Sequence, residues 1–494
     1  MDTIWVLGDQ LNRHIASLAD RAPSDTRVLM VESRAKIASK PYHRQRLHLV
    51  LAAMRRFAAE LRRAGFDVDY RVAPSFAEGL SLHCAQFEPD RVVAMEPMSY
   101  SMANQLPDLG VEVVRSNQFL CHYEDFAEWV QGRKRLVMED FYRWQRRRLG
   151  YLMDGDEPAG GRWNFDADNR QPPPSDGRSW PSAVTDRLDD LDREVVADLP
   201  ETAFGASPDG TWATSRRAAL GRLRDFVDNV LPIFGPHEDA MLDGEWKMAH
   251  STLSPYLNLG LLHPAEVCDA VELAYRGGKV PIQSAEGFIR QVIGWREFVW
   301  GVYWRWMPDY ATGNALEASR PLPPLFTTGN TEMRCVADVL TAVENHGYAH
   351  HIQRLMILGN LALLSAVVPR QLVDWMWASF VDGAEWVMLP NVLGMALYAD
   401  GGLMATKPYA AGGNYINRMS NHCGECRYAP KHRVGDDACP FTTLYWDFLV
   451  RNTERLSSNH RLSRQLKAAE RLGDIEQVQR RAATVLSMLD GGEL

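Results

Sequence analysis

Short apolar runs alternate with longer amphipathic stretches over residues 1 to 125. The runs at 3–8 (TIWVLG) and 27–33 (RVLMVES) end in turn or polar residues, which is typical of buried parallel strands. Between 43 and 64 the apolar residues recur at helical spacing, and Gly65 follows as a stop signal. Further strands are expected at 66–72, 91–95 and 111–116. The alternation predicts an α/β domain with a doubly wound parallel sheet, similar to a Rossmann fold.

Ligands of such sheets bind beyond the carboxyl ends of the strands. In this chain those ends carry Gly8, Asp9, Glu32 and Glu96. The segment contains no G-x-G-x-x-G motif and no P-loop, which argues against a dinucleotide site of the usual kind.

The pattern changes at 126–205, where basic residues are interleaved with aromatic ones and a stretch rich in Gly, Pro and Asp follows. We interpret this segment as a basic linker between domains. Its charges are typical of a solvated helix face, but the interleaved aromatic residues equally favour contact with nucleic acid. The basic residues are Arg133, Lys134, Arg135, Arg143, Arg146, Arg147 and Arg148.

Residues 206–494 show helical periodicity almost throughout, for example at 216–230, 286–304 and 351–366. We therefore expect a large all-α domain after the linker. At 494 residues the chain is too long for a single core, in agreement with a division into domains.

Composition narrows the function classes. The net charge of −9 restricts any nucleic-acid site to a local basic patch. The chain begins with no signal-peptide pattern and contains no apolar run long enough to span a bilayer. We therefore expect a cytoplasmic protein without a membrane partner, in a compartment where disulfides are rare.

Three of the seven cysteines, Cys423, Cys426 and Cys439, lie within 17 residues of one another. In a reducing compartment this spacing indicates a metal site, and zinc and iron–sulfur clusters both accept thiolates. Spacing does not choose between the two metals, and unliganded thiols are the remaining alternative. A closed site needs a fourth ligand, and the candidates are His422, His432, Cys335, Cys268, Cys121 and Cys84.

Three further segments of the helical half combine polar and aromatic residues. The first, HSTLSPYLNLGLLHP (250–264), places hydroxyl side chains before a helix start, which suits either an anion site or an ordinary N-cap. The second has Gln291, Trp295 and Arg296 within little more than one turn. The third has adjacent His350 and His351, which point different ways on a helix and are better suited to proton transfer than to metal binding.

The order of these motifs, followed by an aspartate and an asparagine in the segment 374–402, resembles the FAD-binding domain of the photolyase/cryptochrome superfamily. A narrower group, the bacterial iron–sulfur photolyases and cryptochromes with the prokaryotic (6-4) photolyases, is similar over essentially the whole chain. The matching stretches are GGRWNFDADNR, AHHIQRLMILGN, EWVMLPNVLGM, KPYAAGGNYINRMSNHC and the cysteine spacing.

The resemblance implies three cofactors. A [4Fe–4S] cluster would be bound by Cys335, Cys423, Cys426 and Cys439. FAD would contact Ser251, Leu253, Ser254, Gln291, Arg296, Asp382 and Asn391. A 6,7-dimethyl-8-ribityllumazine antenna would lie near Gly8, Asp9, Glu32 and Glu96.

The resemblance also implies an activity, the light-driven repair of (6-4) photoproducts in damaged DNA by a monomer that flips the lesion out of the duplex. Excited reduced FAD would donate an electron, and His351, supported by His350, would donate a proton. Tyr409 would line the substrate cavity, and Trp375 would carry electrons. The DNA contacts would be Arg146, Arg147, Arg148 and Arg162.

Two alternatives remain at this point: a cryptochrome-like blue-light photoreceptor with the same cofactors, and a zinc-stapled nucleic-acid-binding protein without catalysis. The chain also departs from its relatives at three positions. Met376 and Thr327 replace a tyrosine and a tryptophan of the photoreduction relay, for which Trp377 or Tyr398 would substitute. Met388 replaces a carboxylate expected near the flavin ring.

Overall fold

The computed structural model describes residues 1–494, and its N-terminal part contains a five-stranded parallel sheet in the order β3-β2-β1-β4-β5. The central position of β1 between β2 and β4 gives the doubly wound topology and confirms the predicted α/β fold. The strands are β1 (Asp2–Trp5), β2 (Thr26–Ser33), β3 (Asp67–Ala73), β4 (Val92–Met95) and β5 (Glu112–Val114).

Helices cover both faces of the sheet, because successive residues of each strand point to opposite sides. Ile4 and Val28 pack on one face with apolar residues of α2, whereas Trp5 and Leu29 pack on the other face with residues of α3 and α4. The helices of this part are α1 (Arg34–Ile37), α2 (Arg44–Arg63), α3 (Phe76–Phe87) and α4 (Tyr100–Asp108).

The segment between the sheet and the helical half folds onto both. Helix α7 packs on α2, where His48 and Asp192 form a buried contact of 3.0 Å, and α6 packs on the π-helical segment η4 (Arg290–Arg296). The elements of this segment are α5 (Tyr123–Val130), α6 (Met138–Leu149), the hairpin β6 (Met153–Asp154) and β7 (Glu157–Pro158), η1 (Ala159–Gly161) and α7 (Asp190–Ala197).

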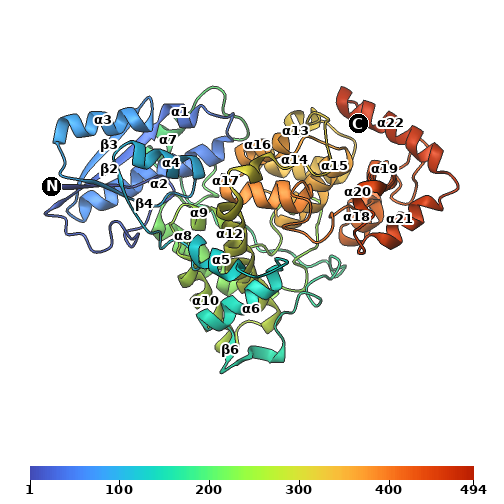
Figure 1. Cartoon of the computed structure of the whole chain (residues 1–494), viewed down its shortest axis with the longest axis horizontal. Coiled ribbons are helices and arrows are strands. Elements are labelled where there is room, and N and C mark those ends of the chain that lie inside the picture. Colours follow the sequence, from blue (N-terminus) through green and yellow to red (C-terminus); the bar gives the residue numbers. More distant parts are fainter.

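The remaining chain is helical, as predicted. Figure 1 shows the sheet domain at one end of the molecule and the C-terminal helices α19 to α22 at the other. The elements up to residue 312 are α8 (Arg216–Asp225), η2 (Phe226–Val230), η3 (Leu231–Ile233), α9 (Ser254–Asn258), α10 (Pro264–Arg276), α11 (Ile282–Ile289), η4 (Arg290–Arg296), α12 (Glu297–Trp306) and η5 (Asp309–Thr312). Those after it are α13 (Leu325–Thr328), α14 (Arg334–His346), η6 (Gln353–Gly359), α15 (Asn360–Leu364), α16 (Pro369–Ser379), α17 (Glu385–Met388), η7 (Leu389–Ala396), α18 (Gly413–Met419), η8 (His422–Glu425), α19 (Pro440–Arg451), α20 (Thr453–Leu456), α21 (Ser463–Glu470) and α22 (Ile475–Gly491).

Several helices contain a π-helical turn, a feature that is frequent at functional sites. The longest such run, Ile282–Trp306, is α-helical at both ends and π-helical at η4 in the middle, and η4 carries Gln291 and Arg296. The π-helical segment η6 follows directly after the His350–His351 pair. The π-helical segment η7 contains Asn391. Three of the predicted FAD contacts thus lie where the regular helix is locally widened.

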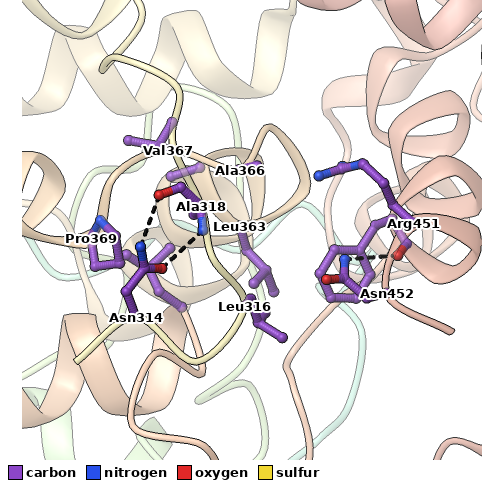
Figure 2. Close-up of a pocket in the computed structure, with 12 residues that line it drawn as sticks. Asn314, Leu316, Ala318, Leu363, Ala366, Val367, Pro369, Arg451 and Asn452 are labelled. Carbon is purple, nitrogen blue, oxygen red and sulfur yellow. Dashed lines mark hydrogen bonds between the residues drawn. The ribbon is translucent and has the colours of Figure 1, made fainter. Parts of the chain in front are cut away.

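One small cavity lies between the loop at 314–318 and helices α15 and α19 (Figure 2). Asn314 closes the loop with two hydrogen bonds of 2.9 Å to the backbone of Ala318. The cavity volume of about 20 Å³ is room for about one water molecule. None of its lining residues is a predicted site residue, so we regard it as a packing void. No helix of the chain combines the length and the apolar composition that crossing a bilayer requires.

Candidate active site and cysteine pocket

The cysteines at 335, 423, 426 and 439 line a single pocket. Cys335 lies in the first turn of α14, Cys423 in η8, Cys426 directly after it, and Cys439 caps the start of α19. All four are free thiols, and Cys84, Cys121 and Cys268 do not line this pocket. Of the four cysteines that are possible fourth ligands, only Cys335 lines the pocket.

The spacing of the four sulfurs is wider than a single zinc ion requires. Four thiolates at the usual Zn–S distance would lie about 3.8 Å from one another. Only two groups of three or more ligand atoms lie within 4.8 Å of one another, and neither contains a cysteine. A larger group such as an iron–sulfur cluster therefore fits this pocket better. His422 also lines it, with Nε2 held at 3.0 Å by Asp338, whereas His432 lies outside and pairs with Asp437.

Three histidines, His250, His350 and His351, form one cluster near η6, with one ring nitrogen of each within 4.8 Å of the others. The rings of His250 and His350 stack at 4.2 Å, and both ring nitrogens of the fully buried His350 lack a hydrogen-bond partner. Burial lowers the pKa of His250 to about 3 and that of His350 well below its ordinary value. These two histidines are therefore neutral near pH 7.

His351 differs from its two neighbours. Its side chain is 46% exposed, and Nε2 lies 3.3 Å from Oδ1 of Asp239. Partial burial lowers the pKa of His351, but the contact with Asp239 and the charge of Glu238 more than offset this, so that its pKa lies above the ordinary value. With nearly half of the ring in solvent, we regard the carboxylate contacts as the dominant effect. His351 is thus the member of the cluster that can hold and donate a proton.

The two acidic residues behind this cluster, Glu238 and Asp239, were not predicted. Oε1 of the buried Glu238 accepts a hydrogen bond of 2.7 Å from the Gln291 amide, and burial raises the pKa of Glu238 to about 7. Burial raises the pKa of Asp239 as well, but its contacts with His351 outweigh this and lower it. The sequence feature that could have indicated these two residues is the run of three consecutive titratable residues in GPHEDA, which lies in a turn without periodicity.

Ser254 and Asp382, both predicted FAD contacts, meet in the structure. The Ser254 hydroxyl donates to Oδ2 of Asp382 at 2.7 Å, and Arg354 pairs with Oδ1 of Asp382 at 3.0 Å. Ser251 and Leu253 belong to the turn that begins α9. Asn391, in η7, donates a hydrogen bond to the carbonyl of Val387 one turn earlier, in α17.

Buried donors without an acceptor are found on the elements expected to hold FAD. Arg296 has unpaired Nε and Nη2 atoms, and Gln353 Nε2 and Trp386 Nε1 are also unpaired, in addition to the two ring nitrogens of His350. Buried polar groups are normally paired, and each exception needs an explanation. A flavin dinucleotide carries ring carbonyls and phosphates that would serve as the missing acceptors, so these residues fit the cofactor.

Tyr409 lies close to the carboxylates of Asp166 and Asp239. Burial first, and the charges of Asp166 and Asp239 after it, raise the pKa of Tyr409. Burial first, and the charge of Asp239 after it, raise the pKa of Tyr415 to about 12. Trp375 lies elsewhere, on α16 beside Phe326 and Phe380.

The structure corrects the expectation that Arg146 contacts DNA. Its side chain is completely buried because the Met138–Leu149 helix turns it inward, and its guanidinium donates to the carbonyls of Tyr151, Leu152 and Trp163. Arg147 and Arg148 are exposed on the same helix, and Arg162 is 53% exposed beside Asp168.

At the carboxyl edge of the sheet, the predicted antenna contacts divide into two pairs. The carboxylate of Glu32 is bound by Arg55 and Tyr70, and that of Glu96 by His122 and Tyr123. Gly8 and Asp9 remain partly exposed, and burial raises the pKa of Asp9 to about 6. A Cβ at Gly8 would lie 2.9 Å from Sδ of Met54, so the Met54 side chain would have to shift to accommodate it.

The fold is that of the photolyases and cryptochromes. The structure matches a bacterial class III photolyase from Agrobacterium tumefaciens with a TM-score of 0.59 and 18% identity, over 99% of this chain and 98% of that one. It matches a cryptochrome from Synechocystis sp. PCC6803 with a TM-score of 0.54 and 15% identity, over 99% of this chain and 93% of that one. At these identities the matches show the fold.

Sequence comparison shows the family. Residues 4–209 match the model of the deoxyribodipyrimidine photo-lyase-related proteins. A (6-4) photolyase from Agrobacterium fabrum (strain C58) is 42% identical over 503 aligned positions, which cover 99% of both chains. The chain therefore belongs to the family of this (6-4) photolyase.

Proposed function

We propose that the chain repairs (6-4) photoproducts in DNA with the energy of light. The 42% identity to a (6-4) photolyase over the whole chain supports this function. The observation that carries it in the structure is the half-exposed, proton-holding His351 beside two neutral histidines and unpaired buried donors.

FAD, when bound, supplies the electron that light makes available for transfer to the lesion. Ser251, Leu253, Ser254, Gln291, Arg296, Asp382 and Asn391 would hold it. The flipped lesion would lie against His351, whose Nε2 is held by Asp239 and whose Nδ1 would donate the proton. His350 would border the same cavity as a neutral ring, and Tyr409 would line it.

Two further groups are part of this proposal. A [4Fe–4S] cluster would occupy the pocket of Cys335, Cys423, Cys426 and Cys439, where it would connect α14 to the loop before α19. A lumazine antenna would bind beyond β1, where Gly8 and Asp9 are accessible. Light absorbed there would add to the light that the flavin absorbs itself.

Illumination of the FAD-loaded, reduced protein with two oligonucleotides of one sequence tests the proposed function. One carries a (6-4) photoproduct and the other a cyclobutane dimer. We expect restored bases only in the first, and only in the light. Repair of the cyclobutane dimer alone would make this dimer the substrate in place of the (6-4) photoproduct. Repair of neither lesion despite photoactive FAD would favour the photoreceptor alternative.

The structure predicts a specific pH dependence. Repair by the wild-type protein should fall as the pH rises through the raised pKa of His351, because the proton is then lost. Asp239→Asn removes the contact that raises this pKa, so the loss should begin at lower pH. Single-turnover repair rates as a function of pH measure the shift. Equal profiles for both proteins, with equal FAD content, would show that Asp239 does not tune His351.

Affinity for lesion DNA should depend steeply on salt. Arg147, Arg148 and Arg162 are the exposed members of the four predicted DNA contacts, and each phosphate contact contributes about 0.9 to the slope of log K against log salt. Replacing each of them by Gln should lower the slope by about this amount. Arg193→Gln on α7 is the control, because Arg193 is also exposed but is not one of the predicted DNA contacts. Slopes that do not change would remove these arginines from the interface.

A further inference from the structure

Four aromatic rings form a continuous path from the proposed FAD site to the surface. The path begins at Trp386 of α17, whose ring lies 5.3 Å from the Arg296 guanidinium. From Trp386 to Trp300 the ring centroids are 5.5 Å apart, from Trp300 to Trp304 5.4 Å, and from Trp304 to Tyr123 4.9 Å. Helix α12, which carries the two middle tryptophans, packs on both α17 and α5 (Figure 1).

The hydrogen bonds along this path differ between its members. Nε1 of the two middle tryptophans, Trp300 and Trp304, is buried and has no acceptor. An oxidised indole at these positions therefore keeps its proton and remains a strong oxidant of the next ring. The partly exposed Tyr123, by contrast, donates its hydroxyl proton to Oε1 of Glu96 at 2.5 Å.

Glu96 is well suited to accept that proton. Its second oxygen, Oε2, is held by Nε2 of His122 at 2.7 Å and by the backbone N–H of Ser116 at 2.8 Å. Burial raises the pKa of Glu96, but its contacts with His122 and Tyr123 outweigh this and lower it, so that it is ionised near pH 7. Loss of an electron from Tyr123 can thus be accompanied by transfer of its proton over a single hydrogen bond.

The region around Trp375 offers no comparable path. The aromatic neighbours of Trp375 are Phe326 at 5.0 Å and Phe380 at 6.0 Å, and phenyl rings are far harder to oxidise than indole or phenol. Trp377 faces the ammonium groups of Lys36 and Lys40 at 5.1 and 4.8 Å, whose positive charge opposes formation of a radical cation.

We propose that Tyr123, with Glu96 as its proton acceptor, is the terminal electron donor of a path through Trp304, Trp300 and Trp386 to the flavin site. The inference rests on the proposed function. FAD, when bound and excited by light, would supply the oxidant beside Trp386. The electron that Trp386 gives up would be replaced from Trp300, and that of Trp300 from Trp304. Tyr123 gives an electron to Trp304 and its proton to Glu96, and becomes a neutral radical. A thiolate reductant from solution then returns the electron, Glu96 returns the proton, and two oxidised thiols form a disulfide.

Tyr303 is the competing end point. Its hydroxyl donates to Oε2 of Glu385 at 2.9 Å, and its ring lies 5.5 Å from that of Trp304. Tyr303 is completely buried, however, so a thiol in solution cannot reach it. Tyr100, 6.0 Å from Trp304, has no carboxylate partner for its hydroxyl and serves as a matched control.

Electron paramagnetic resonance of the illuminated, FAD-loaded, oxidised protein without DNA tests the inference. In wild type labelled with ring-deuterated tyrosine we expect the spectrum of a neutral tyrosyl radical. Tyr123→Phe should remove this radical and slow photoreduction by thiol at least tenfold. Tyr100→Phe and Tyr303→Phe should retain the radical and the wild-type rate of photoreduction. Glu96→Gln should also lower the radical yield, because it removes the proton acceptor and leaves the rings in place.

A radical that persists in Tyr123→Phe, or that disappears in Tyr303→Phe, would overturn the inference. If Tyr123→Phe fails to fold, Trp304→Phe replaces it in the test and must abolish the radical. Absence of a tyrosyl signal from labelled wild type would equally refute the path. Chemically reduced Tyr123→Phe should repair (6-4) DNA at the wild-type rate. Wild-type repair without a Tyr123 radical therefore contradicts only this inference, whereas absence of repair by wild type contradicts the proposed function.

Discussion

Replacement of His351 by Ala should abolish repair of (6-4) photoproducts and leave the cofactors in place. General acid catalysis contributes about 10²- to 10⁴-fold to a rate, and we expect a loss of this size in the light-driven repair rate. Because the side chain is half exposed, its removal should change the folding free energy little. The measurement is single-turnover repair under constant light, together with FAD and iron content.

The control for this variant is His14→Ala, which removes an exposed histidine near the sheet. It should repair like wild type. His351→Asn should also be inactive, because an amide has a similar size but donates no acidic proton. Repair at the wild-type rate by either His351 variant would exclude His351 as the proton donor and would strengthen the photoreceptor alternative.

Cys335→Ala should cause the largest loss of stability. Cys335 is the one member of the cysteine pocket that comes from a distant segment, so a cluster bound there connects α14 covalently to the loop at 423–439. Loss of such a connection costs about 2–5 kcal/mol, by analogy with the removal of a native cross-link. We expect loss of iron, loss of the visible absorption of the cluster and a markedly lower Tm.

Cys84→Ala is the matched control, since Cys84 is a partly exposed free thiol outside the pocket. It should retain iron and unfold like wild type. Full iron content in Cys335→Ala would show that another residue completes the site. His422 is the candidate for that role, because it lines the same pocket and its Nδ1 has no partner. Stoichiometric zinc without iron in the wild type would contradict the cluster proposal itself.

The sequence predicted the elements whose periodicity is strong. The alternating runs of the first 120 residues or so became β1 to β5, and the helical segments after 206 are helices in the structure. The sequence also indicated three of the four cysteines that line the pocket, because these three lie close together in the chain. Periodicity reports which face of an element is buried, and this was sufficient to assign the fold class.

The errors and omissions have one physical origin, which is that charge and burial are decided by tertiary packing. Arg146 lies among exposed arginines in the sequence, but it shares the inner face of its helix with Phe141 and Tyr142, where backbone carbonyls satisfy its donors. Glu238 and Asp239 lie in a loop without periodicity and become significant only because His351 and Gln291 approach them. The Tyr123–Glu96 contact likewise joins a helix to a strand end.

The central claim, light-driven repair of the (6-4) lesion, can be tested by one measurement. The reduced, FAD-loaded protein is mixed in slight excess with an oligonucleotide that carries a single (6-4) photoproduct, exposed to counted flashes of blue light, and the DNA is separated by chromatography. We predict that the lesion strand converts to the undamaged strand in proportion to the number of flashes, with no conversion in the dark. Lesion DNA that stays bound and unchanged after saturating flashes, with photoactive FAD present, would contradict the account.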